Sequence, residues 1–290
     1  MFENASAVTA EGADKNRELI NAGGNIMGAH SRAVRWLAFV GFSMLTTPAL
    51  AETSVINAAD TAWMISATAL VLMMTIPGLA LFYAGMVRKK NVLATMAQSL
   101  ASVALISILW VAYGYSLAFV GDGSWIGTLD RWFLAGMTMD SVNPAAKTIP
   151  EALFMLYQMT FAVITVALVA GAVADRMRFS AYLWFSVGWF TFVYVPLAHW
   201  VWGGGFLSTM GVLDFAGGLV VHLSAGIGGL VAAKVMGNRH GYGNENLAPY
   251  DLSLAVIGTG MLWVGWFGFN GGSALTASPR AVMAITATHL

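Results

Sequence analysis

The sequence predicts an all-α fold, a polytopic helical membrane protein, from three observations. Of the 290 residues, 58% are hydrophobic and only 10% are charged, whereas a soluble domain carries about 25% charged residues. Six apolar runs are each roughly 20 residues or longer, which is the length that crosses ~30 Å of hydrocarbon. Their residues do not alternate between polar and apolar, as the strands of a membrane β-barrel would.

The first 51 residues are expected to lie outside the membrane domain. Residues 1–29 are polar and lack periodicity, so we interpret them as a disordered or untranslated extension, with Met27 as a sensible true start. Residues 30–51 have the pattern of a secretory signal peptide. Its positive start, short apolar core and small-residue cleavage site lie at Arg32 and Arg35, at Trp36–Leu45 and at Ala49–Ala51. An uncleaved anchor is the alternative, although this core is too short to span a bilayer.

Residues 52–290 are expected to form the transmembrane domain. Its apolar runs are about 61–87, 92–120, 151–174, 179–198, 214–236 and 252–273. Lys and Arg gather after the first, third and fifth runs, at positions 88–90, 176, 178, 234 and 239. Because cytoplasmic loops carry the excess of positive charge, these linkers are expected in the cytoplasm. The mature N-terminus and the 121–150 linker are then extracytoplasmic, across the inner (plasma) membrane.

Composition also excludes several kinds of site. The chain has no cysteine, so disulfides, thiolate chemistry and cysteine metal sites are excluded. Its formal net charge is zero, so nothing indicates a basic surface for nucleic acid. A further apolar run begins at 281–290, and we therefore expect the chain to be cut short inside another helix.

Two ionisable residues stand out in the fifth run. Asp214 begins it and His222 lies two turns inside it, in surroundings that are otherwise nearly uncharged. Ionisable groups in membrane helices are costly and usually mark a path or a site. A helix N-cap is the alternative role for Asp214, and it is compatible with a functional one. His222 is flanked by Gly218 and Gly226, so we expect it to face the bundle interior, either as a satisfied buried histidine or as a proton relay.

Aromatic and hydroxyl side chains repeat at helical spacing in two other runs. Trp266, Phe269 and Ser273 share one face of the sixth run, and Tyr157 and Phe161 share one face of the third with Thr165. Taken alone, such stripes are more often packed core or lipid-facing surface. Near the end of the fourth run, His199 and Trp200 are expected at the membrane interface. Trp202 is expected either there or as one ring of an outer cation site.

Several long motifs occur in order along the chain: IPGLALFYAG (76–85), ILWVAYGYSLAF (108–119), YQMTFAVITVALVAGAVADRMRFSAY (157–182), VPLAHWVWGGGFL (195–207), LDFAGGLVVH (213–222) and GWFGFNGGSA (265–274). In these motifs the chain resembles the ammonium transporters of the Amt/Mep/Rh family, bacterial Amt type. The resemblance runs from about Asp60 to Thr276.

The resemblance implies a homotrimer with one pore per subunit, built from two inverted five-helix halves and a final helix. This chain would hold about six of the eleven helices expected, and the second pore histidine would come from a helix it lacks. Trp202, Phe161 and Ser273 match the outer ammonium recruitment site, with Asp214 nearby. Phe161 and Phe269 match the phenyl gate, and His222 matches the first of the twin pore histidines. The resemblance implies no cofactor and no metal, and regulation by a PII-type signalling protein.

Other functions compete with transport. An ammonium sensor would share the motifs, usually with an added cytoplasmic domain. An intramembrane serine protease would use Ser273 with His199 or His222 as base, but Ala274 follows Ser273 where that motif needs glycine. A gas channel of the Rh branch is a third reading, against which the bacterial-type signal peptide argues.

Overall fold

The computed structural model describes residues 55–290, so the expected N-terminal extension (1–29) and signal peptide (30–51) lie outside the described residues. The described part forms six apolar helical spans, which confirms the predicted all-α, polytopic fold. Each span joins one or more helical segments: α2 (Ala58–Met73), η1 (Met74–Leu79) and α3 (Ala80–Met86); α4 (Val92–Leu109), η3 (Trp110–Gly114) and α5 (Tyr115–Phe119); α6 (Glu151–Val173); α7 (Phe179–Trp189), η5 (Phe190–Tyr194) and α8 (Val195–Trp202); η6 (Gly218–Leu223) and α10 (Ser224–Met236); α11 (Leu252–Trp266) and η7 (Phe267–Gly271). Of four short segments, η2 (Lys89–Asn91) begins the second span and α9 (Phe206–Thr209) ends the fourth, whereas η4 (Trp132–Leu134) and α12 (Pro279–His289) lie outside the spans.

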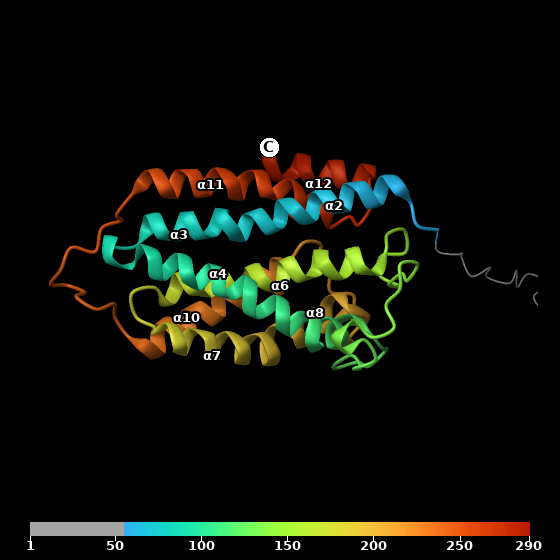
Figure 1. Cartoon of the computed structure of the whole chain (residues 1–290), viewed down its shortest axis with the longest axis horizontal. Helices are drawn as coiled ribbons and strands as arrows, with labels where there is room; N and C mark the ends of the chain where they lie inside the picture. Colours follow the sequence, from blue (N-terminus) through green and yellow to red (C-terminus); the bar gives the residue numbers. More distant parts are fainter. Residues whose placement is uncertain (1–54) are drawn as a thin grey trace, which may run out of the picture. The chain divides into compact units, whose positions relative to one another are not determined.

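Helix α6 forms the centre of the packing. It contacts α2, α4 and α10 (Figure 1), and 17 of its 23 residues are buried. A helix that is apolar on all sides suits such a position, because every face meets another helix. Phe161 lies near its middle and is therefore surrounded by protein.

Glycines let α11 pack closely against the first span. A Cβ atom at Gly258 would lie 2.3 Å from the backbone nitrogen of Phe82, and one at Gly268 would lie 2.5 Å from the carbonyl oxygen of Ala67. No larger residue fits at these contacts, which is why membrane helices use small residues at close crossings. The close approach brings η7, and with it Phe269, against α2.

Segments η1, η3, η5, η6 and η7 are π-helical, one within each span other than α6. π-turns are rare and often occur at functional sites. His222 lies in η6 and Phe269 in η7. The predicted site residues of the fifth and sixth spans therefore lie where the helical register is locally widened.

The predicted ends of two spans were wrong. The fourth span continues through α8 to Trp202 and through α9 to Thr209, past the predicted end at position 198, and the fifth begins at Gly218 rather than at Asp214. Residues 214–217 form a turn instead, in which Gly217 has a positive φ of 102°. The carboxylate of Asp214 holds this turn by accepting backbone hydrogen bonds, so the acidic residue lies before the helix and not in it.

The polar linkers after the first, third and fifth spans meet at one end of the helices. The guanidinium of Arg88 lies 3.1 Å from Asp175 and 2.8 Å from Glu245, and Arg239 lies 3.8 Å from the same Asp175 carboxylate. Asn91 also donates a hydrogen bond to Asp175. We call this the basic end, and the end beside residues 120–150 the loop end. The three linkers that the sequence predicts on one side of the membrane thus lie together at one end of the described helices.

Candidate functional site

Phe161 and Phe269 form a close aromatic pair between α6 and η7. Their ring centroids are 4.4 Å apart and the rings are tilted by 38°. Each side chain is 1% exposed. The spacing within each span predicts only which side chains share a face, and the family resemblance implies the pair; in the structure the helix packing brings the two rings together.

A cavity of about 250 Å³ lies on the loop-end side of this pair. Trp202, Phe161 and Ser273 all line it, and the indole of Trp202 meets Phe161 edge to face at a centroid distance of 5.9 Å. The remaining walls come from Phe119, Ala145, Phe154, Tyr157, Gln158, Val201, Phe215 and Leu275. The three residues that the sequence assigns to one outer site therefore share one small, mainly aromatic chamber.

Ser273 is held by hydrogen bonds at the end of η7. Its hydroxyl donates to the carbonyl oxygen of Phe269 at 2.7 Å and lies 3.3 Å from the hydroxyl of Tyr157. With its proton directed at Phe269, the Ser273 oxygen keeps lone pairs for a donor inside the cavity. Tyr157 also lies within 3.1 Å of the Phe269 carbonyl and so fixes this corner.

Asp214 is a capping residue in this structure. Its Oδ1 accepts from the backbone N–H groups of Gly217 and Gly218 at 2.7 and 2.8 Å. Its Oδ2 accepts from those of Leu219 and Val220, both at 2.9 Å. These are donors of the first turn of η6, which have no partner within the helix. The side chain is fully engaged beside the cavity rather than lining it.

His222 follows the phenyl pair on the side away from the cavity. Its ring lies 5.7 Å from that of Phe269 and 6.4 Å from that of Trp266. The rings of Trp202, Phe161, Phe269 and His222 thus form a continuous series of neighbours.

The expected burial of His222 was wrong for the described part of the chain, where its side chain is exposed. The reason is the position at which α10 packs. A Cβ atom at Gly226, one turn beyond His222, would meet nothing within 4 Å, whereas one at Gly229 would lie 2.8 Å from Ala172 and one at Gly228 would lie 2.8 Å from Trp189. The close glycine contacts of α10 therefore lie at Gly228 and Gly229, further along the helix than His222.

The interface prediction for His199 was also wrong, because this residue is fully buried. Its Nδ1 lies 3.1 Å from the carbonyl oxygen of Ala118 and its Nε2 lies 2.5 Å from that of Gly123. Both partners are backbone atoms of the second span and the segment that follows it. His199 therefore ties the end of α8 to the 118–123 segment beside the cavity.

Gln158 lines the cavity and was missed by the sequence reasoning. It is 9% exposed, and its Oε1 has no hydrogen-bond partner within residues 55–290. A buried acceptor without a partner is costly, so a ligand with N–H donors would be favoured beside it. The signal was present in the motif YQMTF, where a lone amide interrupts an apolar helix.

No group of three or more His, Cys, Asp or Glu side chains in residues 55–290 is arranged to hold a metal ion. The polar side chains that line the cavity carry hydroxyls, an amide and an indole N–H. They suit a ligand that donates hydrogen bonds rather than a transition metal.

Comparison with known proteins identifies a family profile, relatives and solved structures that are similar to this chain. The profile of the Ammonium Transporter Family matches residues 62–290. An ammonium transporter of Bacillus subtilis is 51% identical over 79% of this chain and 56% of its own length. The crystal structure of Candida albicans Mep2 superposes with a TM-score of 0.72 at 38% identity, over 79% of this chain and 51% of that one. A structure titled Sensor Amt Protein superposes with a TM-score of 0.71 at 27% identity, over 78% of this chain and 57% of that one.

Proposed function

Because the chain belongs to the ammonium transporter family, we propose that it serves the transmembrane transport of ammonium and ammonia. The family match covers most of the described residues. The chain spans little more than half the length of the curated relatives that it matches, 57% and 56% for two of them. The activity and partners of the whole protein are therefore part of this proposal.

The cavity at the loop end suits recruitment of the ammonium ion. Ring faces of Trp202 and Phe161 attract a cation, and each such contact contributes about 0.5–2 kcal/mol. The Ser273 hydroxyl and the Gln158 amide oxygen add acceptors for N–H donors. A potassium ion has a similar size and charge but donates no hydrogen bond. The acceptors therefore favour ammonium over potassium.

The Phe161–Phe269 pair blocks the passage of a charged ligand from the cavity into the rest of the pore. Moving a bare ion into an apolar medium costs on the order of 20 kcal/mol before relaxation. Removing the proton costs much less, about 4 kcal/mol at neutral pH for an amine with a pKa of roughly 10. We therefore expect ammonium to lose its proton at the cavity, and neutral ammonia to pass the rings.

His222 is the proposed carrier of the proton. An imidazole can accept a proton on one nitrogen and release one from the other. Its ring lies directly behind Phe269, as the first polar group beyond the gate in the ring series. Asp214 supports the start of this helix with its carboxylate and leaves a negative charge close to the point of deprotonation.

The series of four neighbouring rings is the observation that carries this proposal. The test is uptake of labelled methylammonium, together with current, by the native protein expressed from its own gene and reconstituted in vesicles. His222→Ala should abolish the proton-coupled current, whereas His240→Ala in the exposed 237–251 linker should not. Unchanged current in His222→Ala would remove this residue from the mechanism.

Several family expectations accompany the proposal without further support from the geometry. They are the location in the inner membrane with an extracytoplasmic N-terminus, the 52–290 domain after a cleaved signal peptide, the homotrimer, and a PII-type partner. In this orientation the loop end faces outward, which places Trp202 where ammonium arrives.

Sensing is the second candidate function, and one observation favours it. The structure titled Sensor Amt Protein superposes on the described residues about as well as Mep2 does. The protease reading has less support, because the Ser273 hydroxyl donates to the Phe269 carbonyl and both nitrogens of His199 face carbonyl oxygens. A variant that has lost transport but still supports an ammonium-dependent cellular response would favour sensing.

A further inference from the structure

A second cavity lies at the loop end and adjoins the one at Trp202. It has a volume of about 450 Å³ and shares Phe119, Ala145 and Trp202 with the first cavity. Its other walls include Arg131, Asn143 and Glu151 together with the turn at Gly203 and Gly204. Unlike the first, this cavity is lined by a charged carboxylate.

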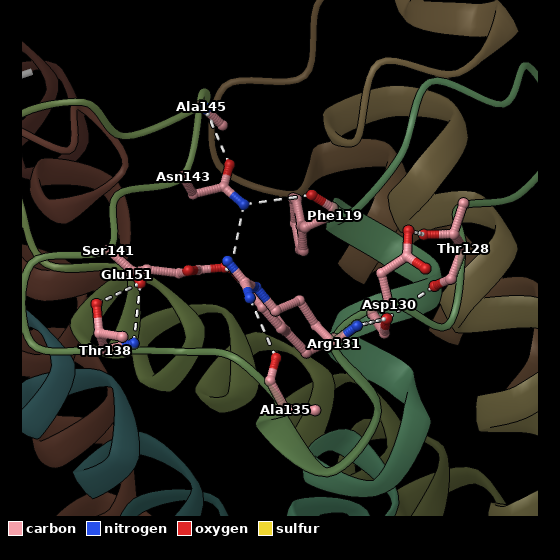
Figure 2. Close-up of polar contacts among 12 residues, drawn as sticks. Phe119, Thr128, Asp130, Arg131, Ala135, Thr138, Ser141, Asn143, Ala145 and Glu151 are labelled. Carbon is pink, nitrogen blue, oxygen red and sulfur yellow. Dashed lines mark hydrogen bonds and ion pairs between the residues drawn. The ribbon is translucent and has the colours of Figure 1, made fainter.

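Glu151 has one carboxylate oxygen without a partner. The residue is 3% exposed, and it is the first residue of α6. Its Oε1 accepts from the hydroxyl of Tyr115 at 2.9 Å and lies 3.4 Å from Nε of Arg131 (Figure 2). Its Oε2 is buried and has no hydrogen-bond partner within residues 55–290. A buried, unpaired carboxylate oxygen is costly, so a donor at this position would be strongly favoured.

The surrounding hydrogen bonds hold the carboxylate in place. Asn143 donates to the hydroxyl of Tyr115 at 3.0 Å, and Tyr115 donates in turn to Glu151. The amide oxygen of Asn143 accepts from the backbone of Ala145 at 2.9 Å (Figure 2). This chain of bonds joins the end of the second span, the 120–150 segment and the start of α6. The site is therefore formed before any ligand arrives.

Arg131 is the positive charge nearest to Glu151 in the described part of the chain, and it satisfies only one side of the carboxylate. Its Nε distance of 3.4 Å is longer than the 2.7–2.9 Å of a good charge-assisted bond. Its side chain is 29% exposed, and it also donates to the carbonyl oxygen of Ala135 at 3.1 Å. Arg131 therefore leaves the carboxylate of Glu151 incompletely paired, although its positive charge weakens the attraction for a second cation. Weak binding suits a position from which the ion must move on.

We propose that Glu151 and this cavity form an entry site for a small cation with N–H donors, ahead of the cavity at Trp202. The inference rests on the proposed transport function and names ammonium as the ligand. The ion would donate to Oε2 of Glu151 and then pass to the ring faces along the shared wall at Trp202. Glu151 thereby raises the local concentration of ammonium at the recruitment cavity.

The test compares Glu151→Gln with Arg131→Gln in methylammonium uptake by the native protein reconstituted in vesicles. Glu151→Gln removes the charge with little change of shape, so KM should rise about five- to tenfold with kcat unchanged. Arg131→Gln removes the competing cation, so KM should fall about twofold or more. A carboxylate that served only to anchor Arg131 would give the same rise of KM in both variants, and that result would overturn the proposal.

Two further outcomes separate this inference from the function on which it rests. Uptake by the native protein with an unchanged KM in Glu151→Gln would overturn the entry site alone. No uptake by the native protein would overturn the proposed transport and the entry site with it.

If Glu151→Gln did not reach the membrane, Glu151→Asp would take its place: it keeps the charge, and a KM within about twofold of the native value is expected. A rise of KM in Arg131→Gln would then overturn the proposal.

Discussion

The indole nitrogen of Trp202 donates a hydrogen bond of 2.7 Å to the backbone carbonyl oxygen of Asp214. The same aspartate accepts four backbone N–H groups with its side chain. One residue therefore fixes both the start of η6 and the orientation of the ring that lines the cavity. The N-cap itself is Gly217, but the carboxylate of Asp214 satisfies the first N–H groups of the helix. The capping role and the proposed functional role of Asp214 are thus two parts of one arrangement.

Asp214→Ala should consequently reduce both stability and transport. Losing an N-cap acceptor costs about 0.5–2 kcal/mol, and here four donors lose their partner. We expect a lower Tm for the purified protein and a loss of methylammonium uptake. Asp251→Ala is the matched control, because Asp251 caps α11 at the basic end by accepting from Ser253 and Leu254. It should lower Tm similarly while leaving KM unchanged, and a normal KM in Asp214→Ala would contradict the link to Trp202.

Gln158→Leu should weaken recognition of ammonium without unfolding the protein. The substitution replaces the amide, with its unpartnered acceptor in the cavity, by an apolar side chain of similar volume. We expect KM for methylammonium to rise about ten- to a hundredfold, since a hydrogen bond with a charged donor contributes about 1.5–3 kcal/mol. Gln98→Leu is the matched control, because Gln98 is also buried with an unpartnered Oε1 but lies outside the cavity. Equal KM values in both variants would exclude Gln158 from binding.

The double variant Phe161→Ala, Phe269→Ala should let potassium through. The two rings are the apolar block that a charged ion must pass, so removing both allows water to enter and solvate the ion. Phe190→Ala is the control, since Phe190 is fully buried in a separate aromatic cluster with Trp110 and Tyr194. Each truncation costs about 3–5 kcal/mol in packing. Potassium current in the Phe190 variant, or none in the double variant, would contradict the gate.

Much of the fold could be predicted from the sequence, because membrane spans are defined by length and hydrophobicity within a single run. The aromatic spacing in the third and sixth spans predicts which side chains share a face, whereas the pairing of Phe161 with Phe269 is implied by the family resemblance and not by the spacing. The ends of spans could not be predicted in this way. They depend on capping partners such as the four N–H groups at Asp214, and on continuation of α8 to Trp202.

The environment of a residue cannot be predicted from sequence patterns when its hydrogen-bond partners are backbone atoms far away in the chain. The buried position of His199 depends on carbonyl oxygens of Ala118 and Gly123, about 80 positions away in the chain. Glu151 received no interpretation from the sequence. It is an acid in the first turn of α6, and its link to Tyr115 exists only after the second span has folded back. The sequence shows which side chains are polar, but it does not show which atoms form hydrogen bonds with them in the folded chain.

The ion pairs at the basic end should differ in their effects on stability. Asp175 is fully buried between Arg88, Arg239 and Asn91, and breaking a buried pair from one side costs about 3–5 kcal/mol because an unpaired charge remains. Asp175→Asn should therefore lower Tm markedly, and added salt should restore little of it. Glu245 meets the same Arg88 but is 53% exposed, and exposed pairs contribute about 0–1 kcal/mol. Glu245→Gln should leave Tm nearly unchanged, so equal Tm shifts in the two variants would show that the network is not held together by Asp175.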